Sequence, residues 1–251
     1  MLDLQNISDN TFLFPVRLDT IERLENTLAA TQFLVSSFET NIMVSEYSAY
    51  NNGLLERLLE KSIQYVFHED HDLILFRTKF LNEMTHSVTT PFVAIWDTDV
   101  IVPKNQVFKA MEMLRNGVAD FVYPYESYFF DTTPLLRKLY FEGMDINVLE
   151  QNTKKMKAMY SPNPVGGAFM ANRQAYVYSG LENENFYGWG LEDGERYYRW
   201  LNQGYRVKRV HGPLFHLSHG RGINSTYGNP DQQLVKRKEV IRVKRNTTEF
   251  Q

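Results

Sequence analysis

The sequence predicts an α/β fold in which helices cover an open, mostly parallel β-sheet. Short strand-like runs alternate with helical patterns from Thr11 to about Tyr123, and this alternation is typical of parallel sheets. Residues 92–96 (Phe-Val-Ala-Ile-Trp) form an unbroken apolar run, as expected of a strand buried on both faces. Since 43% of the 251 residues are hydrophobic, the chain can build one large core. We therefore expect a single domain over residues 1–251.

The elements follow in chain order from composition and periodicity. The first strand is a β-rich apolar run. The helix after it is expected to have Asp19 at its N-cap, Glu22 three residues later and apolar residues at helical spacing. Residues 127–160 have no steady period, so we expect one helix and then an irregular loop. Strands are predicted at 11–17, 41–45, 64–67, 92–96, 166–171 and 205–210, and helices at 19–36, 54–63, 73–84, from 105, 135–141 and from 192.

Composition excludes several classes of protein. The formal net charge is −3, so the chain is not built to coat nucleic acid. It has no cysteine, which excludes a disulfide scaffold, a thiolate zinc site and a cysteine nucleophile, and favours a reducing compartment. There is no transmembrane-length apolar run, and the first residues have no apolar signal-peptide core. We expect a cytoplasmic protein.

Asp97 and Asp99 come directly after the apolar run at 92–96. In open α/β sheets, ligands bind outside the carboxyl ends of the strands, so the pair lies where a site is expected. Two carboxylates on one turn can hold a hard cation such as Mg²⁺ or Mn²⁺ together with phosphate oxygens. The alternative is an acidic turn that caps the next helix.

Residues 187–195 (Tyr-Gly-Trp-Gly-Leu-Glu-Asp-Gly-Glu) combine flexible glycines, a tryptophan and two acids. The glycines allow close backbone approach. Glu192 and Asp193 then begin a helix, whose dipole should lower the pKa of both carboxyl groups. Trp189 offers a flat face to a sugar ring, and one of the acids can take a proton from an attacking hydroxyl. The alternative is a capped helix with a tryptophan in the core.

Three of the six histidines fall within residues 211–219. An imidazole here would complete the coordination of a cation held by Asp99, and its nitrogen favours Mn²⁺ over Mg²⁺. On an extended strand, His216 and His219 point to opposite faces, so both can bind one ion only if the chain turns after Phe215.

The basic side chains fall into two groups. Arg17, with Asp19 nearby, ends the first strand, and Arg77 precedes the acidic turn; arginine can grip a diphosphate through two hydrogen bonds. Residues 236–245 form the one strong charge cluster. This tail is either a solvated helix face or a surface that contacts phosphates or an anionic membrane. The first alternative packs Leu234, Val235 and Ile241 inward.

In this order, these segments resemble the inverting glycosyltransferases of the GT-A fold, over about residues 12–230. The likeness is greatest to the β-1,4-galactosyltransferases, with bacterial chondroitin-type polymerases and polypeptide N-acetylgalactosaminyltransferases as looser relatives. The most specific segment is 187–193, which resembles that family's Trp-Gly-Trp-Gly-Gly-Glu-Asp. The other matches are 14–17 with its Pro-Phe-Arg strand, 77–82 with its Arg-Ala-Lys-Leu-Leu-Asn helix, 97–99 with its Asp-Val-Asp, and Gly166-Gly167 with its Gly-Gly.

The resemblance implies roles for particular residues. Asp193 would be the catalytic base, Glu192 would grip an acceptor hydroxyl, and Trp189 would flank donor and acceptor. The implied metal ligands are Asp99, assisted by Asp97, with His216 as the first choice of histidine and His219 as the second. The implied nucleotide-sugar contacts are Arg17, Asp19, Arg77, Asp97, Gly167, Trp189 and Gly190. The resemblance implies a nucleotide-binding half at about 11–125 and an acceptor and metal-completing half at about 126–230, followed by a basic helix at 231–251.

The implied activity is metal-dependent transfer of galactose or N-acetylgalactosamine from a UDP-sugar to a glycan or lipid-linked acceptor, with Mn²⁺ or Mg²⁺. Leu191 and Gly194 depart from the family's glycine and third acid on the acceptor side, and the family's cysteines, anchor and stem are missing. We therefore expect a bacterial-type cytoplasmic enzyme of surface-polysaccharide synthesis, with the basic tail as a candidate for contact with the inner membrane face. The lysines at 154, 155 and 157 belong to a loop expected to close over the donor. Two alternatives stay open: a non-catalytic nucleotide-sugar or glycan-binding relative, and a sugar nucleotidyltransferase.

Overall fold

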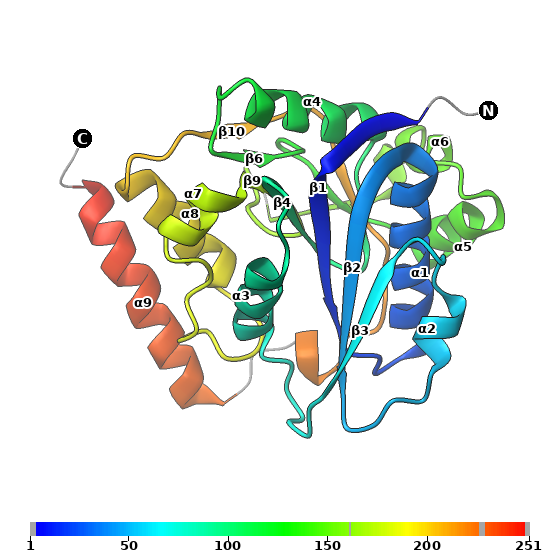
Figure 1. Cartoon of the computed structure of the whole chain (residues 1–251), viewed down its shortest axis with the longest axis horizontal. Helices are drawn as coiled ribbons and strands as arrows, with labels where there is room; N and C mark the ends of the chain where they lie inside the picture. The colour runs from blue at the N-terminus through cyan, green and yellow to red at the C-terminus, as the bar shows by residue number, and fades with distance from the viewer. Residues whose placement is uncertain (1–3, 161, 226–228, 249–251) are drawn as a thin grey trace.

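The computed structural model describes residues 4–160, 162–225 and 229–248. In these ranges a seven-stranded sheet forms the centre of the molecule, in the order β10-β6-β9-β4-β1-β2-β3 (Figure 1). Its neighbouring strands run parallel except where β9 pairs with β4 and with β6. The predicted α/β fold with a mixed, mostly parallel sheet is confirmed.

The described elements have the following bounds. The strands are β1 (Gln5–Val16), β2 (Phe38–Ser48), β3 (Gln64–Glu69), β4 (Phe92–Trp96), β5 (Val100–Ile101), β6 (Phe121–Tyr123), β7 (Phe129–Asp131), β8 (Lys157–Met159), β9 (Ala168–Asn172), β10 (Val207–Arg209) and β11 (Leu214–His216). The helices are α1 (Ile21–Ser37), α2 (Leu54–Leu58), α3 (Arg77–Ser87), α4 (Lys104–Arg115), α5 (Pro134–Gly143), α6 (Asn147–Glu150), α7 (Arg173–Tyr178), α8 (Glu192–Asn202) and α9 (Pro230–Thr248), with short 3-10 turns η1 (Thr153–Lys155) and η2 (Ile223–Ser225).

The strand order changes direction at β1. From β1 the chain passes through α1 to β2 and β3 on one side, and then through α3 to β4 on the other side. Right-handed crossovers therefore place α1 and α3 on opposite faces of the sheet, as Figure 1 shows. Such a reversal leaves a crevice at the carboxyl ends of the two central strands. The residues that follow β1 and β4 are Arg17 and Asp97, so two predicted site segments meet at this crevice.

The core explains why β4 reads as one apolar run. All five of its residues are buried, and the ring of Trp96 packs edge-on against Phe12 of β1 with centroids 5.1 Å apart. At the end of β4, the indole N–H of Trp96 donates to the carbonyl of Val100 at 3.0 Å, which closes the tight acidic turn between them. The turn is therefore held by the core beneath it.

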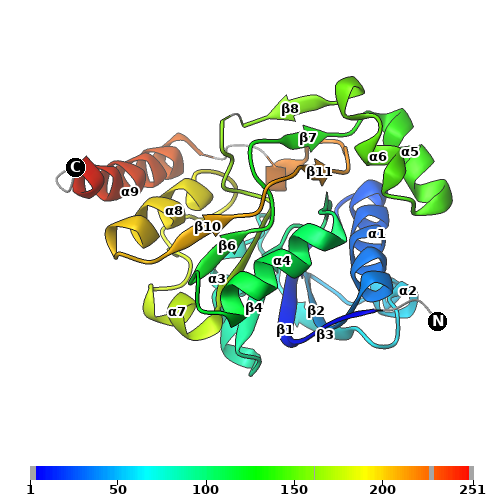
Figure 2. The ribbon, with the colours of Figure 1, turned by 90° about the horizontal axis from the view of Figure 1, so that it is seen from above.

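A second sheet lies over one end of the first, and sequence periodicity did not predict it. In the described residues it has the order β5-β11-β7-β8, and Figure 2 shows β11, β7 and β8 next to one another. The segment expected to be irregular, 127–160, supplies β7 and β8 as well as α5 and α6. Because β7 and β8 have three residues each, they are too short to show a period of two. Their pairing with β11 brings Asp131 beside His216.

Three local expectations were wrong. Thr20, not Asp19, is the N-cap of α1, because its hydroxyl accepts from the Arg23 N–H. The second helix ends at Leu58, and the third begins only at Arg77.

The basic tail is also oriented differently from its expected packing. The α9 residues that were expected to pack inward, Leu234, Val235 and Ile241, are 53%, 41% and 50% exposed. Among the α9 side chains that the structure describes, Lys236 and Val243 are buried instead, at 2% and 7% exposed. Lys236 is buried because its ammonium donates a hydrogen bond to the Trp189 carbonyl. A pattern of hydrophobic residues cannot predict such a contact. Within the described ranges, no helix combines the length and the apolar character needed to cross a membrane.

Candidate active site and metal centre

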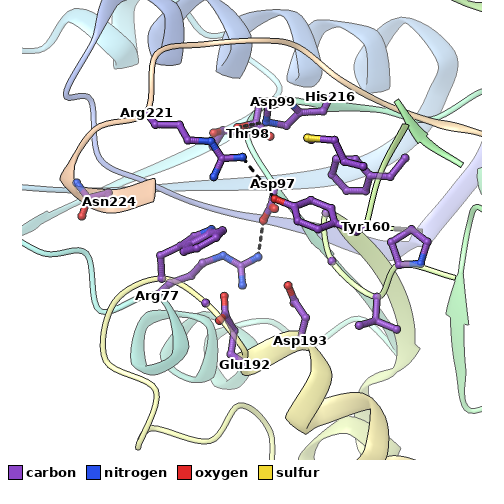
Figure 3. Close-up of a pocket in the computed structure, with 18 of the residues that line it drawn as sticks. Arg77, Asp97, Thr98, Asp99, Tyr160, Glu192, Asp193, His216, Arg221 and Asn224 are labelled. Carbon is purple, nitrogen blue, oxygen red and sulfur yellow. Dashed lines mark hydrogen bonds and ion pairs between the residues drawn. The ribbon is translucent and has the colours of Figure 1, made fainter. Parts of the chain in front are cut away.

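A cavity of about 480 Å³ opens at the crevice between β1 and β4. The ends of these strands, the N-terminus of α8 and the segment after β11 line it. Every residue predicted for the site lines this cavity except Asp19. Asp19 does not line the cavity, but its carboxylate accepts hydrogen bonds from Arg23 and Asn224, and both of these residues line the cavity. The segments at 97–99 and 189–193 therefore face one cleft (Figure 3).

Asp97 joins the acidic turn to α3 and to the residue just before β9. Its carboxylate accepts from the Arg77 guanidinium at 2.5 Å, and its backbone N–H donates to the Gly167 carbonyl at 2.9 Å. Burial and the neighbouring Asp99 raise the pKa of Asp97, although Arg77 opposes the shift. Arg77 thus neutralises one carboxylate of the pair and points into the cleft (Figure 3).

Asp99, His216 and His219 form what we call the Asp-His-His cluster. Their ligand atoms all lie within 4.8 Å of one another. The carboxylate Oδ2 of Asp99 is 3.1 Å from His219 Nε2 and 3.6 Å from His216 Nε2. Burial favours the neutral acid, but the two imidazoles outweigh it and hold the pKa of Asp99 well below its usual range. One ionised oxygen and two ring nitrogens are a donor set that suits Mn²⁺.

Both histidines reach the cluster because the strand ends between them. β11 stops at His216, and the chain then turns, so His219 falls on the same side. The turn is fixed at Leu217, whose N–H donates to the Asp99 carbonyl at 2.7 Å and whose carbonyl accepts from Asn26 at 2.9 Å. The sequence required a turn after Phe215 if both rings were to bind one ion. The structure has such a turn, directly after His216.

Asp131 is a site residue that the sequence did not reveal. Its Oδ1 lies 2.8 Å from His216 Nδ1, which orients the ring with Nε2 toward Asp99. Carboxylates commonly hold metal-binding histidines in this way. To predict this contact, the sequence would have to show both a strand at 129–131 and its pairing with β11, and three-residue strands carry too weak a signal for either.

The loop before α8 has the backbone conformation that its glycines suggested. Gly188 and Gly190 have φ values of 72° and 106°, in the left-handed region. Leu191 follows them with φ 75°, which is unusual for a residue with a side chain. This residue stands where the resembled family has glycine, so the loop tolerates backbone strain at the mouth of the cleft.

Glu192 behaves differently from the prediction. The helix dipole was expected to lower its pKa, but burial and the adjacent Asp193 raise it to about 7. Among the described residues, the Oε2 atom of Glu192 is buried and accepts no hydrogen bond. An unpaired buried acceptor is costly, so an oxygen in this position suits a ligand that brings a donor group.

The remaining predicted contacts are engaged within the protein. Arg17 donates to the Tyr47 carbonyl at 3.0 Å and forms an ion pair with Asp70. Trp189 lines the cavity, with the Arg221 guanidinium 5.6 Å from its ring centroid. Their roles toward a nucleotide sugar stay predictions.

Two comparisons bear on this geometry. A family model described as the N-terminal domain of galactosyltransferase matches residues 149–220, which hold the tryptophan loop, Glu192, Asp193 and both histidines. The catalytic domain of Drosophila β-1,4-galactosyltransferase 7, crystallised with xylobiose, superposes with a TM-score of 0.59 at 18% identity, over 94% of this chain and 81% of that chain.

The chain has a GT-A glycosyltransferase fold. A mutant of the same Drosophila enzyme, in complex with manganese, UDP-Gal and xylobiose, superposes at a TM-score of 0.57 and 16% identity, over 92% of this chain and 79% of that chain. The mannosyltransferase PcManGT from Pyrobaculum calidifontis, with GDP-Man and Mn²⁺, gives a TM-score of 0.54 at 15% identity, over 92% and 69%. A search of curated protein sequences gave no match.

These findings confirm the galactosyltransferase-like GT-A resemblance predicted from the sequence. The predicted enzyme class, a glycosyltransferase, agrees with both comparisons. The predicted manganese-type centre agrees with the Asp-His-His cluster and with the Mn²⁺ in two of the similar structures.

Proposed function

We propose that this protein is a metal-dependent inverting glycosyltransferase that moves galactose or N-acetylgalactosamine from a UDP-sugar to a saccharide hydroxyl. One observation carries the proposal: the Asp-His-His cluster, the Asp97–Arg77 pair and the acids of α8 line the same cavity. A cation site and a cationic side chain can stabilise a departing diphosphate, and a carboxylate can take the proton of the attacking hydroxyl.

The donor half of the reaction depends on charge. Asp99, His216 and His219 would hold a divalent cation, which neutralises the diphosphate as it leaves. Arg77 faces the same space and adds a fixed positive charge. Arg17 directly follows β1 and lines the cavity where the nucleotide would lie in an open α/β sheet. Asp19 would act there only through Arg23 and Asn224, which line the cavity.

The acceptor half depends on the N-terminus of α8. Glu192 Oε2 would accept a hydrogen bond from an acceptor hydroxyl, which satisfies a buried oxygen that has no partner within the described protein. Asp193 would remove the proton of the attacking hydroxyl as that oxygen bonds to the anomeric carbon. The attack comes from the face opposite the departing UDP, so the anomeric configuration inverts. Trp189 and Gly190 would border the two sugars.

The choice of donor draws on the comparisons. The match at 149–220 is to a galactosyltransferase model, and one similar structure holds UDP-Gal with manganese. Another holds GDP-Man with Mn²⁺, so the fold accommodates both nucleotides. Xylobiose in the Drosophila complexes supports a saccharide acceptor. For this chain we favour a glycan or lipid-linked saccharide, in the synthesis of a bacterial surface polysaccharide.

The outward face of α9 supports a place at a membrane on the cytoplasmic side. Leu234 and Ile241 lie two turns apart and are exposed. Lys238 and Arg242 are exposed beside them. Exposed apolar residues among basic ones are typical of helices that lie on anionic lipid. The residue that ends the predicted basic cluster, Arg245, has its side chain outside the described part.

A panel of UDP- and GDP-sugars, assayed for nucleotide release with Mn²⁺, Mg²⁺ or chelator and a saccharide acceptor, tests the proposal. We expect Mn²⁺-dependent release of UDP and a saccharide product of inverted configuration. Nucleotide binding with no release across the panel would identify a non-catalytic relative. Formation of a nucleotide sugar from a sugar phosphate would identify a nucleotidyltransferase.

A further inference from the structure

Arg196 lies on α8, one helical turn after Asp193, and its guanidinium is buried between two carboxylates. Its Nη2 donates to Asp193 Oδ1 at 2.6 Å. Its Nη1 donates to the two oxygens of Glu182 at 2.9 and 3.0 Å. The side chains of Arg196 and Glu182 are 2% and 1% exposed, whereas that of Asp193 is 32% exposed. The guanidinium therefore ties a carboxylate of the cleft to a carboxylate of the interior.

The interior carboxylate is held by other elements. The hydroxyl of Tyr176 donates to Glu182 Oε1 at 2.6 Å, and the Glu182 backbone N–H donates to Asn82 at 2.9 Å. Arg196 also stacks over the ring of Phe169, 4.3 Å from its centroid. Separating a buried pair leaves a charge without a partner or solvent, which is strongly unfavourable. Arg196 is thus fixed before any substrate arrives.

The second oxygen of Asp193 lies against a glycine. A Cβ atom built on Gly166 would be 2.7 Å from Asp193 Oδ2 and 3.5 Å from its Cγ. The backbone of Gly166 is not in the left-handed region, so its φ angle does not call for glycine. Glycine is suited to this position because it has no Cβ atom to contact Asp193. Both residues line the cavity. Oδ2 is therefore the oxygen for which Gly166 leaves room.

We propose that Arg196 and Gly166 are positioning residues that present Oδ2 of Asp193 to the acceptor hydroxyl, and that Glu182 holds Arg196 in place. The inference rests on the proposed function, in which Asp193 takes that proton. As the acceptor O–H bond breaks, the proton bonds to Oδ2 and the oxygen electron pair forms the bond to the anomeric carbon. The bond from that carbon to the diphosphate oxygen breaks, and its electron pair leaves with UDP. Oδ1 stays bound to Arg196 throughout.

Gly166→Ala tests the positioning directly. The added methyl meets the end of a flexible side chain, so the carboxylate must turn while the fold holds. A displacement of about 1 Å at a reacting group commonly lowers the rate by about 100-fold. We expect a fall of that size in kcat, with the donor KM and the melting temperature nearly unchanged. Gly143→Ala, at the end of α5, is the matched control and should keep wild-type kcat.

Arg196→Lys is the second variant, because an ammonium cannot reproduce the planar fork that binds both carboxylates. We expect kcat to fall about tenfold or more, with an unchanged donor KM. The control is Arg199→Lys, one turn further along α8. It loses a hydrogen bond to Glu195 at 3.0 Å, but within the described residues no hydrogen bond or ion pair joins Arg199 to Asp193, so this variant should keep kcat.

The outcomes separate the two proposals. A folded Gly166→Ala variant with wild-type kcat overturns the positioning inference, while an active wild type leaves the proposed function standing. A raised donor KM with unchanged kcat also overturns it, because these residues would then act on donor binding. If Arg196→Lys does not fold, Gly166→Ala decides alone. A wild type that binds UDP and Mn²⁺ but transfers no sugar overturns both proposals.

Discussion

Replacing Asp193 by asparagine should separate catalysis from donor binding. Asparagine keeps the shape of the side chain and an oxygen that can accept the 2.6 Å bond from Arg196, but it cannot take a proton. Loss of a general base commonly costs 10²- to 10⁴-fold in rate, or about 3–5 kcal/mol of transition-state stabilisation. Glu182 still neutralises Arg196 in this variant, so the fold should be retained.

Donor binding should survive because Asp193 is not part of the Asp-His-His cluster. Its carboxylate is one of several negative charges around the cavity, and removing it should leave UDP affinity equal to or slightly above that of the wild type. The assay is kcat with saturating donor and acceptor, together with calorimetric titration of UDP in Mn²⁺. The matched control is Glu142→Gln, an acid-to-amide change on the exposed side of α5.

Two results would refute this reasoning. A variant that keeps more than about a tenth of wild-type kcat would show that another group takes the proton, with Glu192 as the next candidate. Loss of UDP binding in step with activity would show that Asp193 acts on the donor. Neither is expected from a carboxylate that is tied to Arg196 and faces Gly166.

Three further predictions address the metal centre, the buried acid and α9. UDP at 100 times its dissociation constant should stabilise the protein by about 2.7 kcal/mol, or roughly 5–10 °C in Tm. We expect that shift with Mn²⁺ and a much smaller one with EDTA, and His219→Ala should abolish the difference; equal shifts would exclude a metal role. Because the pKa of Glu192 is raised from 4.5 to about 7, its burial costs no stability near pH 4; the cost grows as the pH rises from about 4.5 to about 7 and is complete above that. Glu192→Gln should therefore be more stable than wild type in urea unfolding at pH 8, by about 1–3 kcal/mol, and equal at pH 4; the same gain at both pH values would contradict the assignment. Replacing the exposed Leu234 and Ile241 by serine should abolish flotation with anionic liposomes at unchanged Tm, whereas the buried Val243→Ser should lower Tm; flotation that is unchanged, or absent in the wild type, would leave α9 as a solvated helix.

The parts of the site predictable from the sequence are those that a single segment specifies. The apolar run of β4 predicts a buried strand, and the rule that ligands bind at carboxyl ends then places Asp97 and Asp99. The glycines around Trp189 indicate an unusual backbone, and positive φ angles bear this out at Gly188 and Gly190. Each of these inferences depends only on residues that are close together in the sequence.

The parts that could not be predicted depend on contacts between distant segments. Asp131 meets His216 because β7 pairs with β11, and neither strand is long enough to show its period. Lys236 is buried because the carbonyl of Trp189 accepts its hydrogen bond at 2.8 Å.

Glu192 shows a different limit of the sequence. The helix dipole was the one electrostatic effect visible there, and it predicted a lowered pKa. Desolvation and the adjacent carboxylate are larger in the folded protein, and they reverse the sign. Burial of a carboxyl group has to be known before its pKa can be predicted.

A crystal structure of the protein with Mn²⁺ and UDP, with diffraction recorded at the manganese absorption edge, tests the central claim most directly. We predict one anomalous peak bound by Asp99, His216 and His219, with the diphosphate of UDP on its open side and Arg77 nearby. A peak elsewhere, or UDP bound in the cavity with no ion at these three residues, would contradict the assignment of this cleft as a metal-dependent transferase site.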